Sequence, residues 1–492
     1  FAYADNSDIN NYGSISVTGT DNIILYGVNN SNIKNTALID ASSIQGSNVA
    51  IYAKDSTITN EGAILMGDSI INDEFNPFAN KYSVAVYGTD SAITNTSTGY
   101  ISVGQDSVGL YGIRGSVLNE GVITSVKDGA IAMFIESGKG TNEGVIDLYG
   151  ADSVGLAGKI NSTLVNKGTI NVHGANSIGI FANLSSTVDN RGVINVNGEG
   201  SEGIRLQGES KLLNSGTINI AGNLKDAVKI VYSTGYDVPA IENAGIIKVQ
   251  ERFEVPENLQ IRIKVDPSTV RTPTVSEVTT SSYASEDIDV KFLILNAVRF
   301  EAAYFAAPTP VTILPDFSQK TNAGAYKLEN TFVPSTPNGG PNGGVVRVQS
   351  RSLTWDAIPK VNADGNIDIW MVKIPYDVFS GGLWYEDFGK ALDAKYVTTD
   401  ERATEIFDKL DMIDNEKDLR HYMASLAGNV YANRNQREED IADMFDTSLD
   451  LLKDSKNNTK DNVKINVIAG KGKHSEDTDG ITGYDYESAG VL

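Results

Sequence analysis

The sequence predicts a mainly β protein whose larger part is a right-handed, three-sided parallel β-helix with about 24 residues per coil. Three observations predict it. A phrase of the form Asn-x-Gly-x-Ile returns at a nearly constant interval, each interval holds three short strand-like runs, and no run of ten residues in this region has helical spacing. We assign 1–250 to the β-helix, 251–380 to a β-rich cap, 381–460 to a short α-helical segment, and 461–492 to the first hairpin of an incomplete outer-membrane β-barrel.

The repeated phrase, or a close variant of it, starts at ten asparagines, namely Asn11, Asn35, Asn60, Asn95, Asn119, Asn142, Asn166, Asn190, Asn214 and Asn243. Within one interval, apolar residues alternate with small or polar ones in the runs 145–148, 154–156 and 162–165, and Gly, Asn, Asp and Ser fill the joints. A leucine-rich repeat has a similar period, but its Leu framework is missing. Three strands per interval therefore predict a three-sided β-helix.

The phrase also predicts the role of each position. Ile146 and Leu148 should point inward, and Gly144 should adopt a left-handed backbone conformation. Successive coils lie about 4.8 Å apart, so equivalent residues stack in columns. The recurrent asparagines should then pair their amides in a ladder; its members include Asn119, Asn142, Asn166, Asn190 and Asn214. A second column, facing outward, should hold Asp147, Asn171, Asn195 and Asn219.

Two features interrupt or decorate the repeat and are candidates for binding a partner. One interval carries an insertion, Ile70 to Asn80, in which Phe75 and Phe78 either anchor a partner or pack on their own coil. An aromatic column at the end of the second strand offers either a stacking surface for sugar or protein, or a purely stabilising stack. Its members are Tyr26, Tyr52, Tyr87, Tyr111, Phe134 and Phe181.

The middle region has a different composition. Eleven of the 13 prolines lie between Pro256 and Pro375, and the phrase stops, although strand-like segments continue. Trp355, Trp370 and Trp384 fall close together and predict a compact core. The segment VNADGNIDIW spaces Asn and Asp like a calcium loop, but the closing Glu is missing and Asp-Gly favours a hairpin.

The C-terminal region changes to helical spacing. Thr398 and Glu401 fit a capping box, and apolar residues then follow at helical intervals in three successive segments. Their members are Ala403, Ile406, Phe407 and Leu410; Leu419, Tyr422, Met423, Leu426 and Val430; and Ile441, Met444, Phe445, Leu449 and Leu452. The last 30 residues predict two strands of the length that spans an outer membrane. Because two strands cannot close a barrel, and residue 1 falls inside repetitive text, we expect the chain to be cut at both ends.

The overall composition limits the kinds of partner that the chain is expected to bind. The net charge is -23, so nucleic acid is not expected as a partner. There is no cysteine, which excludes disulfides and thiolate metal sites. We expect no catalytic residue, no metal and no cofactor, and therefore no enzyme. A glycan-active β-helix enzyme remains a remote alternative.

The order of these parts, with the segments IDIWM and LAGNVYANRNQREEDIADMF in 353–492, resembles the type V autotransporters, in particular the large fusobacterial outer-membrane adhesins of the RadD class. The resemblance implies that the cap acts as an autochaperone and that the helix ending near Lys453 lies in the pore of the chain's own barrel. It implies a virulence-related adhesin on the surface of a Gram-negative bacterium that attaches to host or bacterial surface proteins or glycans. The alternative is a purely structural stalk and autochaperone. Release by cleavage at Asn457-Asn458 is a further possibility within this family.

Overall fold

The computed structural model describes residues 2–492 except the ranges 72–81, 222–225, 233–234, 238, 251, 256–258, 265–271, 273–291, 296–297, 307–308, 317–323, 336–346, 397–400, 433, 455–464 and 476–482. The chain divides into two compact units. The first comprises Phe1–Leu314, Ala325–Gln349 and Ala357–Met371, and the second Pro315–Gly324, Ser350–Asp356 and Val372–Leu492.

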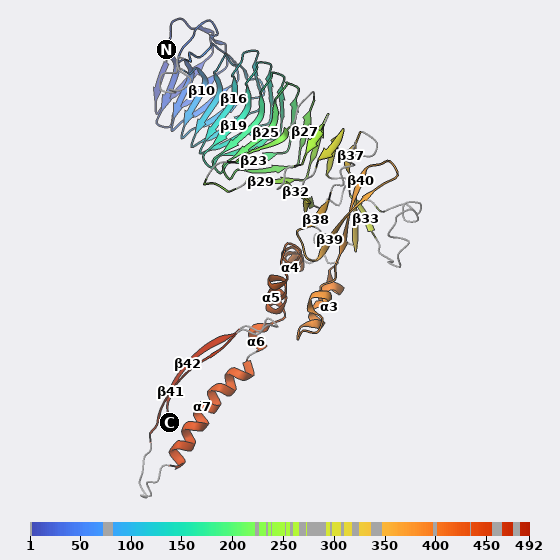
Figure 1. Cartoon of the computed structure of the whole chain (residues 1–492). Coiled ribbons are helices and arrows are strands. Elements are labelled where there is room, and N and C mark those ends of the chain that lie inside the picture. The colour runs from blue at the N-terminus through green and yellow to red at the C-terminus, as the bar shows by residue number, and fades with distance from the viewer. Residues whose placement is uncertain are drawn as a thin grey trace. The chain divides into compact units, whose positions relative to one another are not determined.

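The first unit is built on three parallel sheets that the chain visits in turn, which makes a β-helix (Figure 1). The first sheet contains β1 (Ala2–Asp5), β4 (Ile23–Val28), β7 (Val49–Lys54), β10 (Val84–Thr89), β13 (Val108–Ile113), β16 (Ile131–Glu136), β19 (Val154–Lys159), β22 (Ile178–Asn183), β25 (Glu202–Gln207) and β28 (Asp226–Val231).

The second sheet contains β2 (Asp8–Asn11), β5 (Asn32–Asn35), β8 (Thr57–Asn60), β11 (Ala92–Asn95), β14 (Ser116–Asn119), β17 (Lys139–Asn142), β20 (Thr163–Asn166), β23 (Thr187–Asn190), β26 (Lys211–Asn214), β29 (Ala240–Asn243), β32 (Leu259–Lys264), β36 (Val311–Asp316) and β38 (Val348–Ser350).

The third sheet contains β3 (Ile15–Ser16), β6 (Ile39–Ala41), β9 (Ala63–Met66), β12 (Tyr100–Ser102), β15 (Val122–Ser125), β18 (Val145–Leu148), β21 (Thr169–Val172), β24 (Val193–Val196), β27 (Thr217–Ile220), β30 (Ile246–Val249), β34 (Arg299–Ala302), β37 (Ala325–Pro334), β40 (Ile367–Lys373) and β39 (Trp355–Val361), with β33 (Phe292–Leu295) paired to β37. The predicted fold class is thus confirmed for the β-helix, and the second and third sheets continue past residue 250 without a break.

The core of the β-helix follows from strand alternation. Ile146 and Leu148 of β18 have no exposed surface, and their register partners Ile170 and Val172 in β21 are equally buried. Each coil therefore buries its apolar face against the coils on either side, as a solenoid requires.

The glycine of the repeated phrase is needed for a different reason from the one predicted. Gly144 does not have a positive φ, so the predicted left-handed conformation is wrong. A Cβ on Gly144 would instead lie 2.1 Å from the backbone oxygen of Gly121 one coil earlier, and Gly168 stands in the same relation to Gly144. The corner is a close backbone approach between coils, and only glycine fits it.

Beyond the regular coils, aromatic side chains replace the small aliphatic ones. The short strands β31 (Arg252–Glu254) and β35 (Tyr304–Ala306) pair with each other, and Phe253 lies 5.8 Å from Phe300 between ring centroids. Phe300 stacks on Phe332 at 4.9 Å, and Phe305 meets Phe332 edge-on. This larger apolar core occupies the region predicted as a cap.

The segment VNADGNIDIW forms the turn between β39 and β40, so the hairpin expectation is confirmed. The Asn362 side-chain oxygen accepts the backbone N–H groups of Asp364 and Asn366, and its amide donates to Asp368 at 3.0 Å. Asp368 is 3% exposed and also forms an ion pair with Lys327 at 3.1 Å. These side chains stabilise the turn and its neighbouring strand.

The expected tryptophan core is correct for two of the three residues. Trp355 and Trp370 are 1% and 3% exposed, whereas Trp384 is 42% exposed. Trp384 follows α2 in a short turn, where its ring meets the edge of the Tyr385 ring.

The second unit is helical as predicted. It contains α2 (Asp377–Ser380), α3 (Glu386–Lys395), α4 (Glu401–Asp411), α5 (Glu416–Leu426), α6 (Asn429–Ala432) and α7 (Arg434–Asp454). The predicted apolar positions Phe407 and Leu410 in α4, and Leu419 and Met423 in α5, are buried. The capping residue Thr398 lies outside the described residues. None of the described helices is long and apolar enough to cross a membrane.

The unit ends in an antiparallel hairpin of β41 (Val467–His474) and β42 (Tyr484–Val491), which lies alongside α7 (Figure 1). Glycines on the hairpin face α7: an added Cβ on Gly470 would lie 2.5 Å from the Met444 sulfur, and one on Gly490 3.2 Å from the Phe445 ring. Asp440 of α7 also accepts a hydrogen bond from the Tyr484 hydroxyl at 2.6 Å.

Candidate functional site

The aromatic column runs along the outer side of the first sheet. Tyr26, Tyr52, Tyr87 and Tyr111 are register partners in successive coils. Their ring centroids are 4.9, 5.2 and 4.8 Å apart in that order. The column continues to Tyr3 at one end and Phe134 at the other.

The rings of this column contact each other extensively. Tyr87 and Tyr111 are stacked with an angle of 8° between ring planes, and Tyr52 meets both neighbours edge-on. Burial raises the pKa of Tyr52, and burial together with Glu136 raises the pKa of Tyr111. The column thus presents ring edges and neutral hydroxyls to solvent, while most ring faces are covered by neighbouring rings.

The column is shorter than the sequence predicts. Phe181 occupies the expected register position, but Ala157 stands between it and Phe134. Arg205 and Lys229 follow Phe181 at the same position. The stack therefore ends at Phe134, and further along the column Arg205 and Lys229 form ion pairs with Glu202. Phe75 and Phe78, the other predicted contact residues, lie outside the described residues, as does Asn457-Asn458.

The asparagines of the repeated phrase form one continuous ladder. In each step the side-chain N–H of one asparagine donates to the side-chain oxygen of its equivalent in the next coil, at 2.6–2.9 Å. Its members are Asn11, Asn35, Asn60, Asn95, Asn119, Asn142, Asn166, Asn190, Asn214 and Asn243. From Asn35 onward they are at most 2% exposed. The ladder therefore satisfies buried amides along the rod and is not accessible to a ligand.

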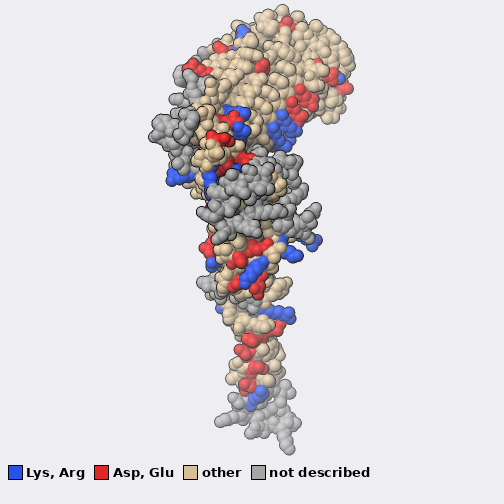
Figure 2. Space-filling model, turned by 90° about the vertical axis from the view of Figure 1, so that its right-hand side faces the viewer, with Lys and Arg blue, Asp and Glu red and all other residues tan. Residues whose placement is uncertain are grey.

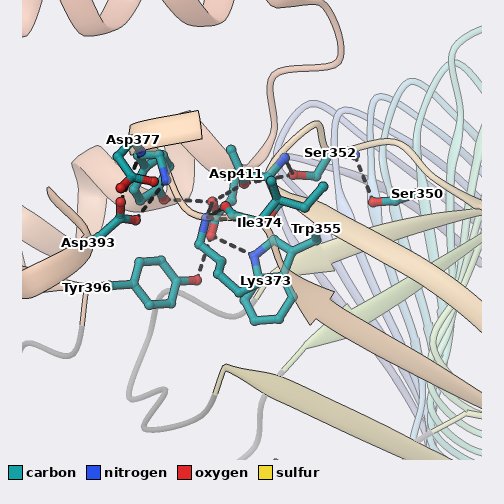
Figure 3. Close-up of polar contacts among 11 residues, drawn as sticks. Ser350, Ser352, Trp355, Lys373, Ile374, Asp377, Asp393, Tyr396 and Asp411 are labelled. Carbon is teal, nitrogen blue, oxygen red and sulfur yellow. Dashed lines mark hydrogen bonds and ion pairs between the residues drawn. The ribbon is translucent and has the colours of Figure 1, made fainter. Parts of the chain in front are cut away.

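A buried polar cluster lies in the second unit, at residues that were not predicted as a site from the sequence (Figure 3). The Asp411 carboxylate, at the end of α4, is 1% exposed. One of its oxygens accepts from the hydroxyls of Thr354 and Tyr376 at 2.5 and 2.7 Å. The other accepts from the indole N–H of Trp355 at 3.0 Å and from the Tyr396 hydroxyl at 2.6 Å.

Lys373 supplies the balancing charge. Its ammonium lies 3.4 Å from Asp411 and donates to the backbone oxygens of Thr354 and Ile374. The same ammonium lies 3.7 Å from the centroid of the Tyr376 ring, a close cation–π contact. Burial lowers the pKa of Lys373, although Asp411 opposes that shift. Burial and Asp411 both raise the pKa of Tyr376.

This cluster joins several chain segments through hydrogen bonds to one buried carboxylate. Each carboxylate oxygen of Asp411 already accepts two or three hydrogen bonds. The donors lie in residues 354–376 and at Tyr396, directly after α3, whereas α4 supplies the acceptor. Asp411 directly follows Leu410 and the apolar series of α4, at a helix position that should also be buried. A charged residue at such a position is the sequence signal that could have revealed this cluster. Among the described residues, no group of three His, Asp or Glu side chains is placed to hold a metal ion.

Comparison with known proteins identifies two segments. Residues 127–251 match the family model of the BigA third pectate lyase-like domain, and residues 287–375 match that of the BigA β sandwich domain. No curated protein and no solved structure matches the chain. The first segment corresponds to the later coils of the β-helix, and the second to the strands from β33 to β40 that follow it. The chain thus carries BigA-like domains, a pectate lyase-like β-helix followed by a β-sandwich domain.

Proposed function

We propose that this chain is a surface-exposed segment of a large bacterial adhesin of the autotransporter type, which attaches its cell to host or bacterial surface proteins or glycans. The observation that carries the proposal is the tyrosine column on the outer wall of the first sheet. Four successive coils place a hydroxyl-bearing ring at one position, and aromatic residues with a polar end are those most favoured at protein interfaces.

The construction of the rod supports display at a cell surface. A solenoid held by a buried amide ladder gives a long, regular wall whose stability arises between neighbouring coils and needs no disulfide. In the face seen in Figure 2, the β-helix at the top is mostly uncharged, with acidic and basic side chains in mixed groups. Such a wall suits contact with another surface better than contact with a polyanion. The BigA-like domains support a role as part of a large surface protein.

The C-terminal hairpin supports the autotransporter part of the proposal. Glycines on the hairpin face that meets α7 leave space for the helix, and Asp440 ties α7 to β42. A helix inside an outer-membrane barrel would need such an inner wall of small and polar residues, with the helix anchored to it. In this proposal the chain's own barrel is a partner of α7.

A second candidate function is a stalk and folding module that binds no partner. It is favoured by the way the tyrosine rings cover each other's faces, as expected of a stack whose purpose is stability. The cluster around Asp411 also favours it, because a well-fastened C-terminal unit suits a folding module.

One experiment separates the two candidates. The four tyrosines Tyr26, Tyr52, Tyr87 and Tyr111 are replaced together by Phe, which keeps the ring stack but removes the hydroxyls. Binding of the labelled chain to epithelial cells and to bacterial cells is measured by flow cytometry. The adhesin proposal expects saturable binding by the unaltered chain and severalfold weaker binding by the quadruple variant.

The control replaces Tyr12 and Tyr236, which are 75% and 46% exposed elsewhere on the chain, by Phe. This variant should bind as the unaltered chain does. Equal binding by the quadruple variant would remove the column as the contact surface. A complete lack of binding by the unaltered chain would favour the stalk.

A further inference from the structure

The outer face of the third sheet carries an aromatic pair that the repeat does not require. Tyr149 follows β18 and is 52% exposed, and its ring stacks on that of His173, which follows β21, with centroids 4.5 Å apart and planes 11° apart. In the coil before, this position holds Val126, and in the coil after, Asn197. The stack is thus a local addition to one part of the wall.

Asp147 fixes both rings. One of its carboxylate oxygens accepts from the Tyr149 hydroxyl at 2.9 Å, and the other contacts Nε2 of His173 at 2.9 Å. The Asn197 side-chain nitrogen lies 3.3 Å from Nδ1 of His173, so the imidazole contacts polar groups through both of its ring nitrogens. An exposed aromatic pair held by a shared carboxylate loses little rotamer entropy when a ligand binds.

An amide ladder continues from this pair along the wall. Asn195 donates to Asn171 at 2.8 Å, and Asn219 donates to Asn195 at 2.8 Å. Each primary amide has two N–H groups and an oxygen with two lone pairs, and the ladder uses at most one N–H and one lone pair of each, both only at Asn195. Unlike the buried ladder of the second sheet, these side chains are half-buried and can offer their remaining groups to a ligand.

The charge of the face indicates what such a ligand would be. From β12 to β27 the outward-facing strand residues are Val, Thr, Asn, Ser and Tyr, and Asp147 is the only charged one among them. Both Asp147 oxygens are engaged by the two rings. These outward strand residues include no Lys or Arg for an anionic polymer and few of the large aromatic anchors that protein interfaces use.

We propose that this face, consisting of Tyr149, His173, Asp147, Asn171 and Asn195 and called here the Tyr149 patch, binds an uncharged glycan chain. The face of the Tyr149 ring that does not stack on His173 would attract the polarised C–H groups of a pyranose ring. The amides meet sugar hydroxyls as both donors and acceptors. Amides that repeat at each coil, about 4.8 Å apart, also suit a polymer that repeats its own hydroxyls along its length. The Tyr149 patch lies on a different sheet from the tyrosine column, so this proposal stands apart from the one above.

The test uses the full chain and defined polysaccharides. Binding to uncharged dextran, laminarin, mannan and galactan, and to anionic polygalacturonate and alginate, is measured by biolayer interferometry. We expect saturable binding to at least one uncharged polysaccharide and none to the anionic ones. Tyr149→Ala should weaken that binding about tenfold. Tyr149→Phe, which keeps the ring but loses the hydrogen bond to Asp147, should have an intermediate effect.

The matched control is Tyr12→Ala, an exposed tyrosine distant in sequence, and it should leave the affinity unchanged. Because Tyr149 is half-exposed, the variants should fold, which thermal unfolding followed by circular dichroism checks. Binding to none of the uncharged polysaccharides, stronger binding to the anionic ones, or full affinity in Tyr149→Ala would each overturn the proposal.

A protein ligand on this face is distinguished by periodate oxidation of the target cells. If Tyr149→Ala lowers cell binding but periodate treatment of the cells does not, the face binds protein and the glycan proposal is wrong. If Tyr149→Ala binds the uncharged polysaccharides with full affinity while the tyrosine-column variant loses cell binding, the adhesin proposal stands and only the Tyr149 patch is refuted.

Discussion

The Asp411 carboxylate accepts a hydrogen bond from the Tyr396 hydroxyl at 2.6 Å, inside a buried cluster. Four neutral donors and one ammonium converge on this single charge. Removing it would leave several buried donors without an acceptor, and unsatisfied buried groups cost more than the net value of the bonds they lose.

Asp411→Asn should therefore lower the free energy of unfolding of the second unit by roughly 3 to 5 kcal/mol, because one member of a buried ion pair is removed while Lys373 stays. Urea unfolding followed by tryptophan fluorescence measures it, since Trp355 donates to this carboxylate. Asp414→Asn is the control. The Asp414 side chain is 54% exposed, and its ion pair with Arg351 is long, at 3.7 Å. Equal midpoints for the two variants would show that the cluster does not stabilise the unit.

The two amide ladders differ in burial, so we expect the loss of one asparagine to lower the free energy of unfolding by different amounts in the two ladders. Asn166 is fully buried and links Asn142 to Asn190, so Asn166→Ala leaves an unpaired N–H and an unpaired oxygen. We expect a loss of roughly 2 to 4 kcal/mol. Asn195→Ala interrupts the outward ladder, where water replaces the lost partner, and should cost well under 1 kcal/mol. Circular dichroism during thermal unfolding compares them, and a larger loss for Asn195→Ala would contradict this account.

Gly144→Ala tests the close approach at the corner. The added Cβ would meet the backbone oxygen of Gly121 at 2.1 Å, and a backbone atom of the neighbouring coil cannot move without disturbing its strand. We expect a loss of roughly 3 kcal/mol or more in the free energy of unfolding. Gly13→Ala is the matched control, because its Cβ would have nothing within 4 Å. A Gly144 variant as stable as the Gly13 variant would show that the coils can separate at this corner.

The stability of the β-helix should depend on pH through Glu202. Burial disfavours its charge, but hydrogen bonds from Arg205 at 2.6 Å and Lys229 at 2.8 Å outweigh burial and lower its pKa from the ordinary value of 4.5. Because the pKa of the folded state lies below that of the unfolded state, this contribution is complete above about pH 4.5. It is lost as the pH falls through the folded-state value.

Glu202→Gln should consequently cost roughly 2 kcal/mol at pH 7, and its stability should converge with that of the unaltered chain as the pH falls through the folded-state pKa of Glu202. Urea midpoints at a series of pH values measure the difference. Glu199→Gln, exposed in the preceding turn, serves as the control and should run parallel to the unaltered chain. A difference for Glu202→Gln that is constant with pH would mean that the carboxylate charge is not responsible.

Prediction from sequence succeeded for contacts between residues that are separated by one repeat of the phrase. The inward position of Ile146 and the register of Asn142 with Asn166 follow from counting along the repeat, because equivalent residues of adjacent coils must be neighbours. The repeated glycine was located correctly, but the reason given for it was wrong. Periodicity shows that a glycine is needed at this position, but it does not show whether a positive φ or a lack of space for a side chain requires it. Trp384 was placed in a core on proximity in sequence alone, and it lies on a short exposed turn.

The sequence by itself thus determined the three-sheet solenoid, its buried and exposed columns, the hairpin at Asn362 and the helical character of the C-terminal unit. Only the tertiary structure decided which non-repeating residues meet. Asp411 joins Thr354, Tyr376 and Tyr396, and Asp147 joins Tyr149 to His173 through their separate hydrogen bonds. Such contacts depend on the path of the chain and the direction of each side chain, which no interval in the sequence encodes, whereas stacked coils bring the same positions together at every turn.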